Sequence, residues 1–326
     1  MLAPPPEPEP APGIPAQVAW SHVLAQGDVP AARQDHVLVA NGAGTRVYLH
    51  GGRSGGTVLG DLWVFDSEIN QWSRLAPTGP VPAARFGHNA VYDPAGQRLL
   101  LFGGQATSGF LSDIWAYVIA ENRWEQLAPN GSGPLDRYGA GGGFDPASGS
   151  FYLTHGFTSA GRFDDTWRYA QEQGWQQFAV SGERPEARCL LRSVFDPQGN
   201  RLLLFGGQSN TAGFLGDLWA FDLATDTWRR ITSPGPSARN LYSWNLRGDT
   251  GQAYLFGGAT PAGADNSLWV FNLQTDAWSE VTPTGSPPPG RSGHDAVWLE
   301  SRQALFVFGG TVAGSERNDI WLASFP

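Results

Sequence analysis

The sequence predicts an all-β protein, a six-bladed β-propeller of four-stranded blades whose ring is closed by an N-terminal strand that completes the last blade. Two observations suggest repetition. The string RLLLFGGQ occurs at positions 98–105 and again at 201–208, and an arginine recurs every 51 or 52 residues along the chain. A fixed period of about 50 residues is typical of propellers, in which each repeat forms one blade.

The repeat carries a second mark, because a Gly-Gly pair or its variant begins eighteen residues after every such arginine. The six arginines, called the ring arginines below, are Arg33, Arg85, Arg137, Arg188, Arg239 and Arg291. The pairs are Gly51-Gly52, Gly103-Gly104, His155-Gly156, Gly206-Gly207, Gly257-Gly258 and Gly309-Gly310. Six copies in register make the repeat far more specific than any single motif.

Two tryptophans follow each of the first five pairs and one follows the sixth, and their spacing predicts how the ring closes. The first set is Trp63, Trp115, Trp167, Trp219, Trp269 and Trp321, and the second is Trp72, Trp124, Trp175, Trp228 and Trp278. The sixth copy ends before its second tryptophan, whereas Trp20 lies 52 residues before Trp72. The N-terminal segment is therefore predicted to supply the last strand of the last copy, which removes exposed sheet edges.

Each copy contains four short apolar or alternating runs, which in the second copy are HNAVYD, RLLLFGG, DIWAYV and RWEQLA. Turn signals such as DPAGQ and AENR separate them, as expected for consecutive strands. We expect one domain over residues 15–326, preceded by a Pro-rich flexible tail over residues 1–14. Such tails often follow an export signal or lipid anchor, so we expect an exported protein, periplasmic or at a bacterial cell surface, rather than a cytoplasmic one.

Composition excludes several classes of function. The net charge is −9, which argues against nucleic acid as a partner because phosphate binding needs clustered positive charge. All 21 basic residues are arginine, so a lysine Schiff base is excluded, and the one cysteine, Cys189, excludes an internal disulfide framework. No run of 18 apolar residues is present, so membrane insertion is not expected.

These marks resemble the kelch-repeat family. They are Arg-x-x-His (RQDH, RFGH, RSGH), the double glycine, Asp-hydrophobic-Trp with an aromatic residue two positions on (DLWVF, DLWAF), and the spaced second tryptophan. The resemblance covers residues from about 16 to 326 and implies a six-bladed ring with a central channel. It leaves function open, since kelch propellers include peptide-capturing adaptors, sugar mutarotases, nitrile specifier proteins and galactose oxidase.

Features that repeat in every copy are interpreted as scaffold, whereas a binding site is usually asymmetric. The tryptophans and glycine pairs are therefore assigned to blade packing. The ring arginines need counter-charges, and Asp61, Asp113, Asp165, Asp217 and Asp319 are the expected partners. In one interpretation the Arg and Asp side chains hold the blades together; in the other, ring arginines line a channel mouth that accepts a carboxylate or an acidic peptide.

The fifth copy departs from the others. It has Ser267 in place of the aspartate, Tyr242 in place of His and Trp244 at a position otherwise small or aliphatic, with Asp265 as a partial substitute acid. These departures make Arg239, Tyr242 and Trp244 candidates for a specific ligand contact.

The residue after each glycine pair is expected on a loop at the same mouth. The six are Arg53, Gln105, Phe157, Gln208, Ala259 and Thr311. In peptide-binding kelch adaptors this position contacts the ligand, so the resemblance implies a ligand-binding role for Arg53, Gln105 and Gln208.

No catalytic residue, metal ligand or cofactor is predicted. His36, His88 and His294 fall in register, but equivalent positions on neighbouring blades are expected too far apart to share a zinc ion. The marks of copper-radical oxidases, of nitrile specifiers and of Gly-x-Ser-x-Gly hydrolases are absent from the sequence. We therefore predict a binding propeller with an Arg- and Gln-lined mouth and a protein or peptide partner, or a small acidic or sugar ligand. The alternative is a carbohydrate-active enzyme similar to a sugar mutarotase, whose acid-base site would leave no local motif.

Overall fold

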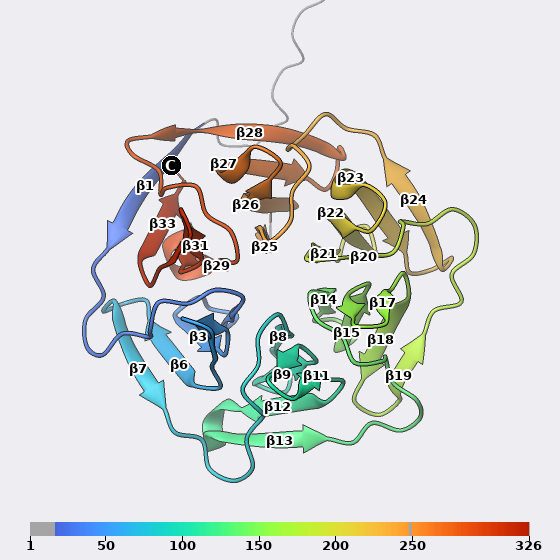
Figure 1. Cartoon of the computed structure of the whole chain (residues 1–326), viewed down its shortest axis with the longest axis horizontal. Coiled ribbons are helices and arrows are strands. Elements are labelled where there is room, and N and C mark those ends of the chain that lie inside the picture. The colour runs from blue at the N-terminus through green and yellow to red at the C-terminus, as the bar shows by residue number, and fades with distance from the viewer. Residues whose placement is uncertain (1–16, 248–249, 326) are drawn as a thin grey trace, which may run out of the picture.

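A computed structural model describes residues 17–247 and 250–325, and its strands stand in a ring around a central axis (Figure 1). The all-β prediction is confirmed. The helices in the described ranges are two 3-10 turns, η1 (Ile119–Glu121) and η2 (Glu300–Arg302). No helix in these ranges is long and apolar enough to cross a membrane. The predicted tail over residues 1–14 lies outside the described residues.

Strand pairing divides the described residues into six antiparallel four-stranded units, numbered here in chain order. The first unit contains β2 (Val37–Ala40), β3 (Arg46–His50), β6 (Leu62–Asp66) and β7 (Gln71–Leu75). The second contains β8 (Asn89–Asp93), β9 (Arg98–Phe102), β12 (Ile114–Val118) and β13 (Arg123–Leu127). The third contains β14 (Gly141–Asp145), β15 (Ser150–Thr154), β18 (Thr166–Ala170) and β19 (Gly174–Gln177).

The fourth and fifth units have longer middle strands than the others. The fourth contains β21 (Arg192–Asp196), β22 (Arg201–Ser209), β23 (Gly213–Asp222) and β24 (Thr227–Ile231). The fifth contains β25 (Ser243–Arg247), β26 (Gln252–Thr260), β27 (Gly263–Asn272) and β28 (Ala277–Thr284). The sixth contains β29 (Asp295–Leu299), β30 (Ala304–Phe308), β33 (Ile320–Ser324) and, from the other end of the chain, β1 (Gln17–Val23). The first strand of each unit lies next to the axis (Figure 1).

The N-terminal strand closes the ring as the tryptophan spacing predicted. β1 pairs antiparallel with β33, with Trp20 opposite Ala323. It also pairs in parallel with β28 of the fifth unit, starting at Gln17 opposite Thr282. Residues from both ends of the chain thus share one sheet, visible beside the C-terminal label in Figure 1.

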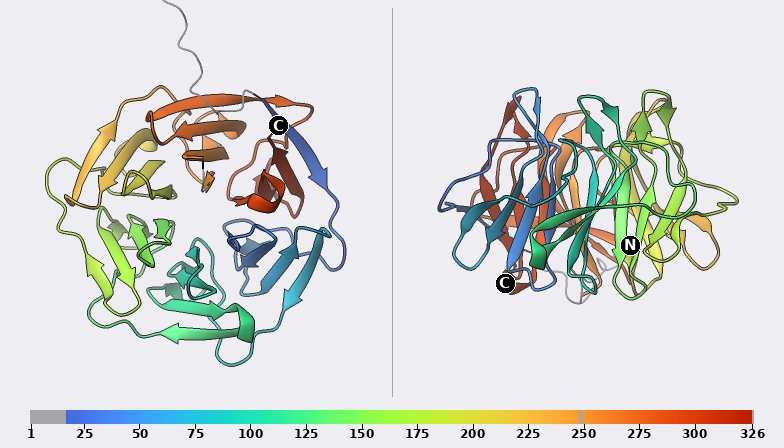
Figure 2. Two further views of the ribbon diagram at one scale, coloured as in Figure 1. Left: turned by 180° about the vertical axis from the view of Figure 1, so that it is seen from behind. Right: turned by 90° about the horizontal axis from the view of Figure 1, so that it is seen from below.

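A short hairpin links the second and third strands of each unit at one face of the ring. In four units the hairpin has strands of its own, which are β4 (Arg53–Ser54) with β5 (Thr57–Val58), β10 (Gln105–Ala106) with β11 (Gly109–Phe110), β16 (Phe157–Thr158) with β17 (Gly161–Arg162), and β31 (Thr311–Val312) with β32 (Ser315–Glu316). In the fourth unit the hairpin is the tip of β22–β23, and in the fifth unit it is the tip of β26–β27. A further short strand, β20 (Arg188–Cys189), pairs with β22 in the fourth unit. Figure 2 shows the ring from behind and from the side.

The core lies between neighbouring units, where the sequence assigned the tryptophans. Trp72 on β7 is 2% exposed. Its ring contacts Phe65 of its own unit and Phe308 of the sixth unit, at centroid distances of 5.1 and 5.3 Å. Such tilted and edge-on aromatic contacts add to the burial of apolar area. The prediction that the repeated tryptophans pack blade against blade is therefore confirmed at this seam.

Candidate functional site

Five ring arginines are held by buried ion pairs with the predicted aspartates. Arg33 is typical, with Nη1 and Nη2 donating to the two carboxylate oxygens of Asp61 at 2.7 and 2.8 Å. Nη1 also donates to the carbonyl of Gly51, and Nε donates to the carbonyl of Ala31. The tryptophan two residues after the aspartate donates its indole N–H to the same carboxylate, as Trp63 does to Asp61 at 2.7 Å. The other pairs are Arg85–Asp113, Arg137–Asp165, Arg188–Asp217 and Arg291–Asp319.

Electrostatics keep these aspartates ionised. Burial by itself raises the pKa of Asp61, but the hydrogen bond and the positive charge of Arg33 outweigh it, so the pKa of Asp61 lies below its ordinary value of 3.8. The ring arginines are 0 to 1% exposed, so they lie inside the blades and not on the walls of a mouth. The geometry supports the interpretation in which the Arg–Asp pairs hold the blades together.

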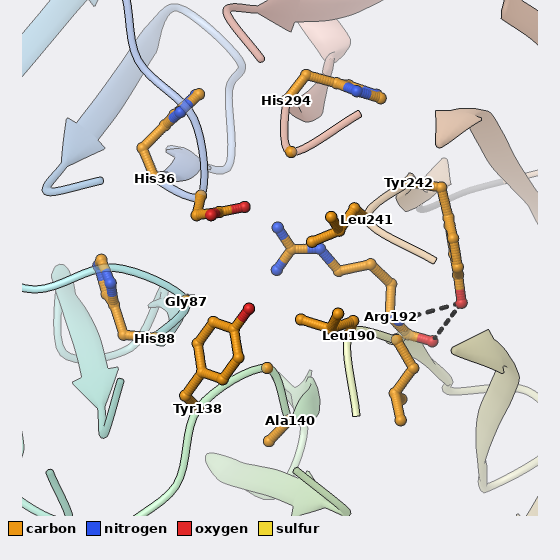
Figure 3. A pocket seen from close by; sticks show the side chains of 14 residues that line it. His36, Gly87, His88, Tyr138, Ala140, Leu190, Arg192, Leu241, Tyr242 and His294 are labelled. Atoms are coloured by element: carbon orange, nitrogen blue, oxygen red, sulfur yellow. Dashed lines mark hydrogen bonds between the residues drawn. The ribbon is translucent and has the colours of Figure 1, made fainter. Parts of the chain in front are cut away.

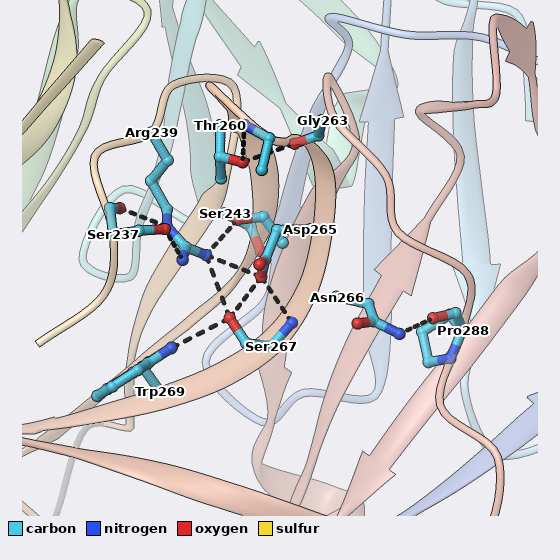
Figure 4. Close-up of polar contacts among 12 residues, drawn as sticks. Ser237, Arg239, Ser243, Thr260, Gly263, Asp265, Asn266, Ser267, Trp269 and Pro288 are labelled. Carbon is cyan, nitrogen blue, oxygen red and sulfur yellow. Dashed lines mark hydrogen bonds and ion pairs between the residues drawn. The ribbon is translucent and has the colours of Figure 1, made fainter.

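In the fifth unit the ring arginine, Arg239, is held by a different set of side chains (Figure 4). Arg239 Nη1 contacts Asp265 Oδ1 at 3.1 Å and Ser267 Oγ at 3.3 Å, and Nη2 donates to Ser237 Oγ at 3.1 Å. Ser267 Oγ in turn accepts from the indole of Trp269. Burial outweighs the contact with Asp265 and lowers the pKa of Arg239, which is 1% exposed.

The other two candidates from the fifth unit are also buried. Tyr242 is 1% exposed, and its hydroxyl donates to the carbonyl of Phe205. The same hydroxyl accepts from the backbone N–H of Arg192 (Figure 3). Trp244 is 4% exposed and stacks at a tilt on Trp278, 5.6 Å between ring centroids. The departures of this copy therefore serve packing, and neither these two side chains nor the ring arginines present an open surface at the mouth. Trp244 forms part of the wall of a cavity deeper in the channel, which is described below.

A closed ring of backbone hydrogen bonds surrounds the axis. It is formed by the residues two positions after each ring arginine, called the axial ring: Asp35, Gly87, Gly139, Leu190, Leu241 and Gly293. Each N–H donates to the carbonyl of the preceding member, and Asp35 closes the circle by donating to Gly293, at distances from 2.7 to 3.1 Å. All six have positive φ, which for Leu190 and Leu241 (58° and 53°) costs about 1–2 kcal/mol each.

The six residues that follow the glycine pairs lie beside this ring. Each pairs through its backbone with the residue directly after a ring arginine: Arg53 with Gln34, Gln105 with Phe86, Phe157 with Tyr138, Gln208 with Cys189, Ala259 with Asn240 and Thr311 with Ser292. The structure thus brings Arg53, Gln105 and Gln208 to one face of the propeller, called the mouth below. All three are partly exposed.

Aromatic side chains join them at the mouth. Phe86 and Tyr138 meet edge to face at 5.6 Å, and Phe110 and Phe157 do so at 5.7 Å. The guanidinium of Arg53 lies 5.1 Å from the ring centre of Phe86, and that of Arg162 lies 5.4 Å from Phe157. Sequence reasoning did not name Phe86, Tyr138, Phe110 or Arg162. A usable signal was available for two of them, because Phe86 and Tyr138 directly follow ring arginines.

Arg192 also lies near the axis, and sequence reasoning missed it as well. It extends from the start of β21 toward a small pocket of about 40 Å³, into which the hydroxyl of Tyr138 also points (Figure 3). Its Nη2 lies 3.3 Å from Asp295 Oδ1. On the other side of the pocket Asp35 receives Nε and Nη2 of Arg53, both at 2.9 Å. Burial raises the pKa of Asp35 and of Asp295, and the nearby arginines oppose this shift.

The three in-register histidines border the same pocket but do not converge (Figure 3). His88 Nε2 contacts His50 Nδ1 at 3.1 Å, and His294 Nε2 contacts Ser243 Oγ at 3.2 Å. Burial lowers the pKa of His36, His88 and His294, so these rings are neutral. Within residues 17–247 and 250–325, no three His, Cys, Asp or Glu side chains are grouped to hold a metal ion.

The fold and the repeated contacts define a kelch-repeat β-propeller. The chain belongs to this family: the model of the KLHDC2/KLHL20/DRC7 Kelch-repeats domain matches residues 15–190 and 170–325. It is 28% identical over 319 residues to the leucine-zipper-like transcriptional regulator 1 homolog of Drosophila melanogaster, covering 91% of this chain and 31% of that protein. It is also 28% identical over 278 residues to human host cell factor 1, covering 77% of this chain and 13% of that protein. The chain thus spans less than a third of the length of these relatives.

Proposed function

We propose that this chain is a protein-binding propeller that captures its partner at the mouth. The observation that carries this proposal is the group of half-buried aromatic residues, Phe86, Phe110, Tyr138 and Phe157, bordered by Arg53 and Arg162. Tyr, Phe and Arg are the residues enriched at protein interfaces, where aromatic and Arg anchors contribute much of the binding energy. A surface of this composition on one face of a rigid ring suits a partner that covers several units.

The polar groups at the mouth indicate a partner with acidic or acceptor-rich side chains. The Arg53 side chain is 39% exposed, and Nε and Nη2 contact Asp35, whereas Nη1 has no partner among the described residues and can donate to a second carboxylate. Arg162 Nη1 contacts the Asn210 carbonyl oxygen, a neutral partner. Gln105 and Gln208 add amides that can donate or accept. Hydrogen bonds from arginine to carboxylate are about twice as strong as neutral ones, so acidic residues are the favoured contacts.

The shape of the mouth favours a protein over a sugar. Its axial pocket has a volume of about 40 Å³, which accommodates a few water molecules but not a monosaccharide. Asp35 is the one carboxylate among the residues that line this pocket. An acid-base enzyme of the mutarotase type would need a larger enclosure with two catalytic groups at the substrate. The carbohydrate-active alternative is therefore not favoured by the mouth.

The test is selection of peptides from a random display library on the purified protein, followed by affinity measurement. We expect the selected peptides to be enriched in Asp and Glu together with an apolar residue. We also expect Phe86→Ala and Arg53→Gln each to weaken binding at least tenfold. Arg46→Gln is the matched control, because it removes an arginine that pairs with Asp66 away from the mouth. Binding that tolerates both mouth variants, or selection of basic peptides, would contradict the proposal.

A further inference from the structure

We propose that the central channel beneath the axial ring contains a second binding site, and that its ligand is a free α-amino acid. The site is a cavity of about 210 Å³ whose walls come from the first strands of all six units. It lies on the other side of the axial ring from the mouth, because its walls begin four or five residues after each ring arginine. Arg192 lines both this cavity and the axial pocket of the mouth, but the inference does not rest on the proposed partner binding, which is assigned to Phe86, Arg53 and their neighbours.

The cavity is where the chain departs from its own repeat. The residues four positions after the ring arginines differ in every copy, and three of them, Asn89, Arg192 and Asp295, line the cavity. The repeat dictates nearly identical residues at the scaffold positions, whereas these three are an amide, a cation and an anion. The two charged side chains reach the cavity: those of Arg192 and Asp295 are 28% and 10% exposed.

Arg192 and Asp295 form a loose pair that leaves most of the guanidinium without partners. Their nearest atoms are 3.3 Å apart, and within the described ranges the Arg192 side chain donates no hydrogen bond of good geometry. Asp295 is held in place by the backbone, because Oδ2 accepts from the N–H of Leu38 at 2.9 Å and Oδ1 accepts from the N–H of Ala296 at 3.0 Å. A fixed carboxylate therefore stands beside a guanidinium with unused donors.

This arrangement matches the head group of an amino acid in charge and spacing. An α-amino acid presents a carboxylate and an ammonium on one carbon, so the carboxylate can accept two hydrogen bonds from Arg192 while the ammonium donates to Asp295. A simple anion would face the Asp295 charge and a simple cation would face Arg192, both at short range in a medium of low dielectric constant. A zwitterion avoids both repulsions.

The rest of the cavity wall favours a small apolar side chain on the ligand. Val91, Phe144 and Leu246 supply apolar surface, and Asn245 brings an amide nitrogen that has no partner among the described residues. The volume accommodates a ligand on the order of ten non-hydrogen atoms. Residues 90–92 in the middle of β8 and residues 245–247 at the far end of β25 are partly exposed, which places the entrance at the face opposite the mouth.

The experiment is titration of the purified chain with single L-amino acids at millimolar concentration, followed by calorimetry and by the indole N–H signal of Trp244 in NMR spectra. We expect small apolar amino acids to bind and to shift that signal, since Trp244 lines the cavity. Matched probes remove one charge at a time: the N-acetyl derivative lacks the ammonium, and the corresponding amine lacks the carboxylate. Each should bind at least tenfold more weakly.

Three variants separate the site from general stability. Arg192→Gln should abolish binding, and Asn245→Leu should do so by filling the cavity while both charges remain. Arg46→Gln, at a surface pair, should bind like the unmodified chain. The proposal is overturned if no amino acid binds at millimolar concentration. It is also overturned if the N-acetyl derivative binds equally well, or if a folded Arg192→Gln protein retains the affinity.

Discussion

Removal of one ring aspartate tests how the blades are held together. In Asp113→Ala, Arg85 remains 0% exposed but loses hydrogen bonds of 2.6 and 2.8 Å, and Trp115 loses the acceptor of its indole N–H. Breaking a buried ion pair by removing one partner costs about 3–5 kcal/mol, because the remaining charge stays buried. Asp113 is 21% exposed, so water can partly replace it and we expect a loss near 3 kcal/mol.

The loss is measured as the change in the free energy of urea-induced unfolding, followed by tryptophan fluorescence at neutral pH. Asp66→Ala is the control, because Asp66 pairs at 3.0 Å with Arg46, which is 38% exposed. Exposed pairs contribute about 0–1 kcal/mol, so this variant should be nearly neutral. If the two variants lose equal stability, the buried ring pairs do not hold the blades together in the way proposed.

Three further predictions follow from other parts of the ring. Burial lowers the pKa of His50, His155 and His294 to about 3, so below pH 6.5 the unfolded chain binds protons that the folded chain does not. Unfolding free energy should fall by about 2 kcal/mol per histidine between pH 7 and pH 5, and an unchanged urea midpoint would refute this. Deletion of β1 should leave the edge of β33 unpaired and cause self-association in size-exclusion chromatography; a stable monomer would argue against ring closure by this strand. Gly87→Ala would place a Cβ 2.0 Å from Tyr138 Cδ2 at a φ of 61°, and should destabilise the chain by about 2–3 kcal/mol in the same urea assay; a neutral effect would show that the Tyr138 ring can move aside.

Features that recur in every copy were predictable from sequence. The 51- or 52-residue spacing of Arg33 and its equivalents located the strands, and the position of Trp20 predicted the pairing of β1 with β33. The aspartate partners followed from the need of the six arginines for counter-charges and from the recurring position of an aspartate two residues before the first tryptophan of a copy. The indole hydrogen bonds were not predicted, because spacing shows that Trp63 lies near Asp61 but not that its N–H points to the carboxylate.

The candidate site was harder to predict, for a physical reason. Arg192 acts at the axis because strands from the fourth and sixth units converge there, and no local spacing connects it to Asp295, more than a hundred residues later. Tyr138 reaches the mouth because its neighbour Arg137 is anchored to Asp165. In contrast, the visible departures of the fifth copy were compensated within that unit, where Asp265 and Ser237 replace the missing aspartate around Arg239.

Departure from a repeat is therefore informative only when nothing nearby compensates for it. Ser267 departs from the repeat, but its hydroxyl and its neighbours satisfy Arg239 and Trp269, so the change carries no signal of function. Arg192 also departs from the repeat, and its unused hydrogen-bond donors lie beside a cavity. A folded protein keeps such unused donors at a cost in stability unless a ligand accepts hydrogen bonds from them. Asp295 has two roles, since its bond to the N–H of Leu38 also joins the sixth unit to the first across the seam of the ring. A change at Asp295 would therefore affect ring closure and ligand binding together, which is why Arg192→Gln and Asn245→Leu are the variants that isolate the site.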